Sequence, residues 1–122
     1  MNINKYYLNQ WTAGGRVYPH LDCWGLVCDV YLKELGIKLN AYTTFSESDM
    51  SIPYAEYVQQ FYRVSPYAIE DYDIACWHVG KCLKHVGIVY NKRILHCDRK
   101  RGTVYQIAPA GEHITYYRLR PR

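Results

Sequence analysis

The sequence predicts an α+β fold in which N-terminal helices pack on an antiparallel β-sheet. The length of 122 residues suits one compact domain spanning the whole chain, residues 1–122. Apolar residues make up 49% of the chain and include 14 tyrosines, which is enough for a packed core. Helical spacing of apolar residues comes first, and short β-like runs follow residue 73, an order that is typical of the α+β class.

Two helices are expected in the first half of the chain. Residues 23–35 carry apolar side chains at helical spacing, with Asp22 as the N-cap and Gly36 as the residue that ends the last turn. The stretch "PYAEYVQQFYR", residues 53–63, begins with proline and predicts a second helix. The "AGG" stretch at 13–15 predicts a turn ahead of the first helix.

Five short strands are expected in the second half. The runs are "DIACWHV", "KHVGIVY", "RILHC", "TVYQI" and "ITYYRLR". They are separated by Gly, Asn-Lys, Arg-Gly and Pro-Ala-Gly, which are turn-forming residues. Because the connections are short, consecutive strands should pair antiparallel.

Composition and charge exclude several classes of function. The net charge of +4 and the pI near 8.8 suit a polyanionic environment such as a cell wall, but are too weak to indicate nucleic acid. No run of 18 apolar residues predicts a membrane span, and the N-terminus "MNINKYYLNQW" lacks the apolar core of a secretory signal. We therefore expect synthesis in the cytoplasm and no membrane or nucleic-acid partner.

Cys23 occupies an unusual position, at the start of the first expected helix. An odd number of cysteines, five, argues against a disulfide framework and leaves room for one reactive thiol. Unpaired N–H groups at a helix N-terminus stabilise a thiolate, so Cys23 is where a nucleophile would be activated. Cys28 lies inside the helix and gains no such help. The alternative is that Cys23 packs as a small hydrophobic residue.

Two histidines are predicted to share one face of a β-hairpin. If Asn91-Lys92 is a two-residue turn, the numbers of paired residues sum to 183. His85 then lies opposite Asp98, and Gly87 lies opposite His96. Either His96 or Asp98 could orient the imidazole of His85, the arrangement that a cysteine nucleophile needs from its base. A loop of odd length would place His96 on the other face.

A metal site is the competing use of the cysteines and histidines. Zinc sites favour closely spaced cysteine pairs with a second matched pair. Cys23 and Cys28 lie along a helix, and Cys76, His78 and Cys82 straddle an expected turn. Because no second pair has suitable spacing, we expect no metal and no cofactor.

The stretches "DCWGLVCDVYLKELGI" and "HVGIVYNKRILHC" resemble the NlpC/P60 cysteine peptidases over roughly residues 8–108. Members of that family commonly show an Asp-Cys-x-Gly-Leu-Val motif and a later His-Val-Gly-Ile strand. The resemblance implies that Cys23 is the nucleophile, His85 the base and His96 the orienting residue. The Asp-Cys-Trp-Gly-Leu variant is most similar to the branch found in bacteriophage tail-assembly proteins.

The resemblance also points to four further candidate site residues. Accessory roles are open for Asp98, as a substitute orienting group, and for Asp22, mainly as the N-cap. Trp11 stands where family members often carry a tyrosine, and Trp24 stands where many carry a serine. Both tryptophans could line a substrate groove or simply pack, and these departures put substrate recognition in doubt more than the nucleophile chemistry.

The resemblance also implies a papain-like fold and a function. Family members usually hydrolyse the bond between D-γ-glutamate and a diamino acid in peptidoglycan stem peptides. We therefore expect peptidoglycan peptides as the substrate, phage tail proteins as further partners, and a location on a virion tail or at the cell wall. Two alternatives stay open: a catalytically silent tail-assembly or binding module, and an amidase or acyltransferase that uses the same triad.

Overall fold

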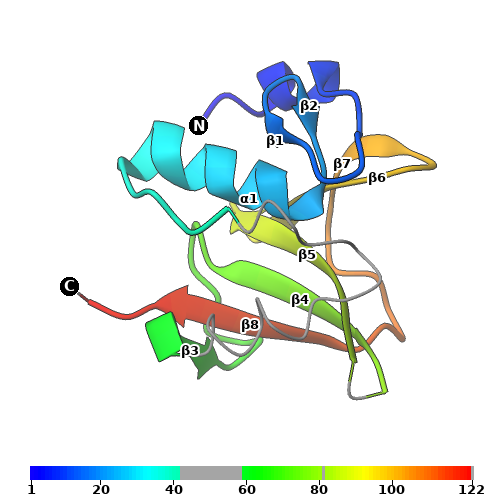
Figure 1. The fold of residues 1–122 in the computed structure, drawn as a ribbon. Helices are drawn as coiled ribbons and strands as arrows, with labels where there is room; N and C mark the ends of the chain where they lie inside the picture. Colours follow the sequence, from blue (N-terminus) through cyan, green and yellow to red (C-terminus); the bar gives the residue numbers. More distant parts are fainter. Residues whose placement is uncertain (42–58, 81, 122) are drawn as a thin grey trace.

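The computed structural model describes residues 1–41, 59–80 and 82–121 (Figure 1). Its N-terminal half holds one α-helix and short helical turns, and its C-terminal half is a sheet. The elements in chain order are η1 (Ile3–Leu8), β1 (Arg16–Val17), β2 (His20–Leu21), α1 (Cys23–Val30), η2 (Tyr31–Leu35), β3 (Phe61–Val64), β4 (Ile74–Val79), β5 (Cys82–Tyr90), β6 (Arg93–Asp98), β7 (Gly102–Gln106) and β8 (Ile114–Leu119). The expected α+β class is confirmed.

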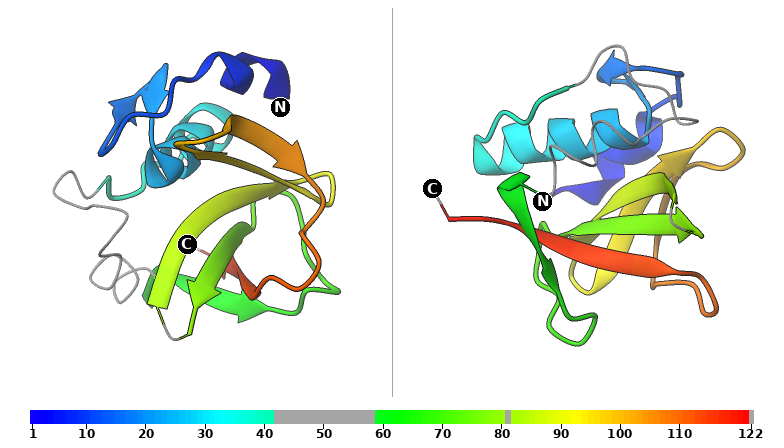
Figure 2. Two further views of the ribbon diagram at one scale, coloured as in Figure 1. Left: turned by 90° about the vertical axis from the view of Figure 1, so that its right-hand side faces the viewer. Right: turned by 60° about the horizontal axis from the view of Figure 1, so that its bottom comes forward.

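The sheet has six strands in the order β3-β8-β4-β5-β6-β7, and every neighbouring pair is antiparallel. All five strands expected from the sequence are present. Helix α1 forms a second layer over one face and packs mainly against β5 and β6 (Figures 1 and 2). The small β1–β2 hairpin in turn packs on α1. This layering brings the start of the helix over the central strands.

The first helix begins and ends where the sequence predicts. The Asp22 side chain accepts a hydrogen bond from the N–H of Gly25, so it is the N-cap of α1. The helix continues after Val30 as a short π-helical segment, η2. Gly36 follows in the left-handed conformation, with φ of 66°, and its N–H bonds back to the last turn.

The second predicted helix is borne out at Gln59 and Gln60 and wrong at residues 61–63. Residues 53–58 lie outside the described residues, and Phe61–Val64 form strand β3 instead, paired with β8. Phe61 is buried, and β3 forms through its backbone pairing with β8, so this long-range pairing wins over local helical spacing. Only α1 is an α-helix of more than one turn in the described residues, so the expectation of several N-terminal helices is only partly met.

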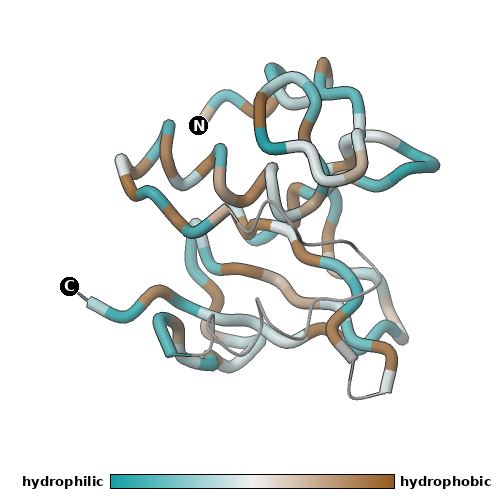
Figure 3. The backbone as a smooth tube through the Cα atoms, in the orientation of Figure 1, coloured by the Kyte–Doolittle hydropathy of each residue, from teal (hydrophilic) through white to brown (hydrophobic). Residues whose placement is uncertain are grey.

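The core lies between the helical layer and the sheet. Leu26 and Val30 of α1 pack in one buried cluster with Ile88 of β5 and Leu95 of β6. In Figure 3 hydrophobic residues recur along α1 and the central strands. Within the described residues, no helix is long and apolar enough to cross a membrane.

Candidate active site

Cys23 is the first residue of α1, as predicted. Its residue surface is completely buried, with 0% exposure. The preceding Asp22 is also buried, and its Oδ1 accepts from the Gly25 N–H at 2.8 Å and from Nη1 of Arg16 at 2.6 Å. The carboxylate therefore serves as N-cap and ion-pair partner at once. Because Arg16 pairs with it, the negative charge beside the thiol is compensated.

Two glycines leave room for close backbone contacts between the β1–β2 hairpin and the first turn of α1. A Cβ on Gly25 would lie 2.1 Å from the carbonyl oxygen of Gly15, and a Cβ on Gly15 would lie 1.8 Å from the carbonyl oxygen of His20. The Asp22 N–H donates to the same Gly15 oxygen at 3.3 Å. A side chain at Gly25 would push the hairpin off the helix start, and one at Gly15 would distort the hairpin itself. The first clash explains the Gly of the Asp-Cys-Trp-Gly motif in physical terms.

The β5–β6 hairpin has the predicted register at its turn. Asn91 and Lys92 both have positive φ, 51° and 61°, as a tight two-residue turn of the primed type requires. Tyr90 pairs with Arg93, and the paired residues end at Ile88 and Leu95. The rule that paired numbers sum to 183 is therefore confirmed over this part of the hairpin. The further pairing of His85 opposite Asp98 is not part of the ladder.

Side chains rather than backbone pairing bring the two histidines together. Nε2 of His85 lies 2.9 Å from Nδ1 of His96, a hydrogen bond between the two rings. Gly87 makes room for this contact, because a Cβ there would lie 2.9 Å from the His96 Cβ and 2.8 Å from Cγ2 of Ile94. His96, not Asp98, therefore contacts the candidate base.

The imidazole of His96 is buried, and that of His85 is half-buried. Burial lowers the pKa of His85 to about 4, although the nearby Asp98 carboxylate acts in the opposite direction. Burial, followed by the neighbouring His85, likewise lowers the pKa of His96 to about 4. Both rings are thus neutral at pH 7, and in the hydrogen bond between them one nitrogen donates and the other accepts.

Asp98 is engaged elsewhere. Its carboxylate accepts from the backbone N–H of Arg101 at 2.7 Å and from Nε of the same residue at 2.9 Å. It remains close enough to influence His85 electrostatically. Its part in the site is therefore a charge near the pair, with its hydrogen-bonding capacity directed to Arg101.

Sequence reasoning missed Trp77, which completes the surroundings of the pair. It lies on β4 directly across from His85. The Trp77 ring centroid lies 4.9 Å from that of His85 and 4.8 Å from that of His96. The β-like run "DIACWHV" does place this residue on a strand, but a register irregularity between Trp77 and His78 hides its cross-strand partner from simple counting.

The two tryptophans predicted for a groove take different places. Trp24 is 4% exposed and packs in the core, with its indole N–H donating to the carbonyl oxygen of Asn40 at 2.9 Å. Trp11 is half-buried, and the guanidinium of Arg99 lies 5.2 Å from its ring centroid. Trp11 is thus the more accessible of the two.

None of the other described thiols lies at a helix start as Cys23 does. Burial raises the pKa of Cys28 to about 12, so this thiol stays protonated at neutral pH. Cys76 and Cys97 are buried and form no disulfide. The side chain of Cys82 lies outside the described residues. Among the side chains that are described, no group of three or more potential ligands could hold a metal ion.

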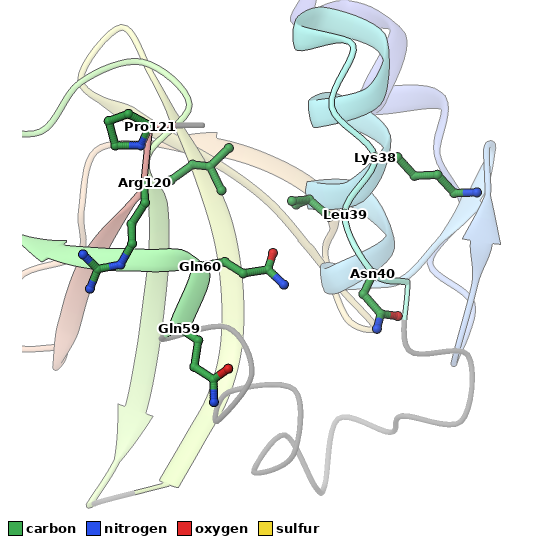
Figure 4. A pocket seen from close by; sticks show the side chains of 8 residues that line it. Lys38, Leu39, Asn40, Gln59, Gln60, Arg120 and Pro121 are labelled. Atoms are coloured by element: carbon green, nitrogen blue, oxygen red, sulfur yellow. The ribbon is translucent and has the colours of Figure 1, made fainter.

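A cleft of about 610 Å³ opens elsewhere, between the segment after η2 and the edge formed by β3 and β8 (Figure 4). Its lining consists of Lys38, Leu39, Asn40, Gln59, Gln60, Leu119, Arg120 and Pro121. Figure 4 shows Leu39 and Gln60 facing one another, whereas the charged ends of Lys38 and Arg120 point away. None of the predicted site residues lines it.

Known proteins support the family suggested by the sequence. The NlpC/P60 family model matches residues 9–120. No curated protein sequence matches the chain significantly. The crystal structure of the NlpC/p60 domain of the peptidoglycan hydrolase SagA is similar, with a TM-score of 0.65 and 18% identity over 93% of this chain and 90% of that chain. At this identity the likeness concerns the fold, and it is the family match over nearly the whole chain that shows membership: the chain belongs to the NlpC/P60 family.

Proposed function

We propose that the protein is a cysteine endopeptidase that hydrolyses amide bonds in peptidoglycan stem peptides. The observation that carries the proposal is that α1, which begins at Cys23, packs against β5 and β6. These strands carry His85 and His96, which are hydrogen-bonded to each other. The similar structure belongs to a protein named as a peptidoglycan hydrolase, which supports this substrate class.

The ring contact suggests how protons would move. Nε2 of His85 is occupied by His96, which leaves Nδ1 to take the proton of the Cys23 thiol. As the Sγ–carbon bond forms, this proton passes to Nδ1, and it then passes to the amine as the carbon–nitrogen bond breaks. Water then attacks the thioester carbon and gives a proton to His85, and this proton returns to Sγ of Cys23 as the sulfur–carbon bond breaks. Because burial lowers its pKa to about 4, His85 acts as a neutral general base and not as half of a resting ion pair.

The finer assignment rests on the sequence motif. The resemblance to the tail-assembly branch supports cleavage of the D-γ-glutamyl–diamino acid bond by an enzyme carried on a phage or prophage tail. The net charge of +4 is compatible with work at an anionic cell wall. Delivery by a virion would also account for a location outside the cytoplasm.

Hydrolysis of defined muropeptides tests the proposal. Wild-type protein should release new amino groups and the two expected fragments, identified by mass spectrometry. Cys23→Ala and His85→Gln should each lower the rate by at least about a hundredfold, because each removes a group that acts on the reacting atoms. Cys28→Ala is the matched control and should retain the rate. Hydrolysis that survives Cys23→Ala would refute the proposed mechanism.

The burial of Cys23 supports a second candidate, a binding module without turnover. A substrate carbonyl cannot reach a thiol that has 0% exposure unless access opens. Alkylation with iodoacetamide followed by peptide mass spectrometry separates the two. Labelling of Cys23 that slows in His85→Gln supports the peptidase. An unreactive Cys23, with muropeptide binding but no fragments, supports the module. Transfer of the acyl group to an added amine would indicate an acyltransferase.

A further inference from the structure

Trp77 contacts both histidines of the candidate site at once. Its ring lies 4.9 Å from His85 and 4.8 Å from His96, measured between centroids, and it meets the two rings at 51° and 45°. The two imidazoles themselves meet at 75°, edge to face. The three rings thus form one cluster in which a change in the orientation of the indole must displace at least one imidazole.

The indole is fixed by a residue next to β8, the strand that pairs with β4 on the side away from β5. Nε1 of Trp77 donates to Oε2 of Glu112 at 2.6 Å, a short bond to a charged acceptor. Glu112 is exposed and lies in the segment that leads into β8. That segment is anchored beside it, because the His78 N–H donates to the carbonyl oxygen of His113 at 3.0 Å.

We propose that Trp77, held by Glu112, is a positioning residue for the His85–His96 pair, and that Glu112 orients the pair through the indole. The Glu112 charge also acts directly on His96, as the weakest of the influences on that ring. This inference rests on the proposed peptidase function and adds to it two residues outside the cysteine and histidine motifs. The indole covers the two rings, keeps water from them and restricts their rotation. It also offers its face to the imidazolium that forms on His85 during the reaction, within the range of a cation–π contact.

Variants at Glu112 separate hydrogen bonding from charge. Glu112→Ala removes the acceptor, and Glu112→Gln keeps an acceptor oxygen while removing the charge. Glu70→Ala is the matched control, an exposed glutamate in the segment between β3 and β4. We expect Glu112→Ala to lower kcat about fivefold with little change in KM, and Glu112→Gln and Glu70→Ala to stay within twofold of wild type.

Trp77→Phe provides the decisive background, because it keeps an aromatic ring but has no N–H. If Glu112 orients the pair through the indole, most of the effect of Glu112→Ala should be lost in Trp77→Phe, and only the direct charge effect on His96 should remain. The ring ¹⁵N and ¹H NMR signals of His85 and His96 give a second readout that needs no turnover. They should move clearly in Glu112→Ala and Trp77→Phe, move much less in Glu112→Gln, and remain in place in Glu70→Ala.

The outcomes distinguish this inference from the proposed function. If wild-type protein hydrolyses no muropeptide, the peptidase proposal fails, while movement of the ring signals in Glu112→Ala still supports the positioning role. If the signals do not move, or if Glu112→Ala retains its full effect in the Trp77→Phe background, the positioning role is refuted whether or not the protein is a peptidase.

Discussion

Acidification from pH 7 to pH 5 should destabilise the fold through the buried imidazole of His96. This residue is 1% exposed, and burial lowers its pKa from 6.5 to about 4. Between these values the unfolded chain binds a proton that the folded chain does not, so stability is complete above pH 6.5 and falls as the pH drops toward 4. The full loss is about 3 kcal/mol, and at pH 5 it reaches about 2 kcal/mol.

Thermal unfolding followed by circular dichroism measures this loss. For a chain of 122 residues the entropy of unfolding is about 0.26 kcal/mol/K. A loss of about 2 kcal/mol then lowers Tm by about 8 °C between pH 7 and pH 5. His85, whose pKa burial also lowers to about 4, acts in the same direction, as does His78 through its own lowered pKa. Because His85 and His96 are in contact, their contributions should not add in full.

A variant and its control test whether His96 causes the fall in Tm. His96→Gln removes the titrating ring, so the fall in Tm between pH 7 and pH 5 should shrink by about 8 °C. His20→Gln is the control, because His20 is exposed on β2, outside the six-stranded sheet that carries His96. An equal fall in Tm for wild type and His96→Gln would refute the assignment, as would a Tm that rises on acidification.

Two substitutions test the local geometry. Gly87→Ala should destabilise the protein by about 2 kcal/mol in urea unfolding, because the new methyl group would lie under 3 Å from Ile94 and His96; unchanged stability would mean that the sheet adjusts freely. Asp22→Ala should cost about 3 kcal/mol, because it removes both the cap on Gly25 and the buried ion pair with Arg16, and Asp22→Asn should cost less because the amide oxygen still accepts; equal losses would argue against a capping role.

The sequence predicts the elements whose signals are local. Asp22 and Gly36 mark the two ends of the cysteine helix, and the turn at Asn91 and Lys92 sets the register of the hairpin. Strand β3 escapes prediction because it exists through its pairing with β8, which lies more than fifty residues away in sequence. Local helical spacing carries no information about such a partner.

The ring cluster escapes prediction for a related reason. The hairpin rule places His85 and His96 on one face, and the structure does bring their rings into contact. Trp77 lies on β4, which pairs with β5 on the side away from β6. A register irregularity next to Trp77 changes which residues oppose each other. Glu112 comes from the segment before β8, so its bond to the indole depends on the strand order of the whole sheet.

The contact between the histidines also restricts which ring nitrogen carries the proton. His85 can take the thiol proton on Nδ1 only if its Nε2 carries hydrogen and donates to Nδ1 of His96. The neutral His96 ring must then carry its own hydrogen on Nε2, a buried atom with no hydrogen-bond partner in the described part of the chain. Burying such a donor costs about 1–3 kcal/mol, and the opposite arrangement leaves the same atom as a bare acceptor. Since the reverse arrangement also blocks Nδ1 of His85, only the first is compatible with a general base. The aromatic cover from Trp77 therefore holds in place an arrangement that the hydrogen bonds of His96 alone leave incomplete.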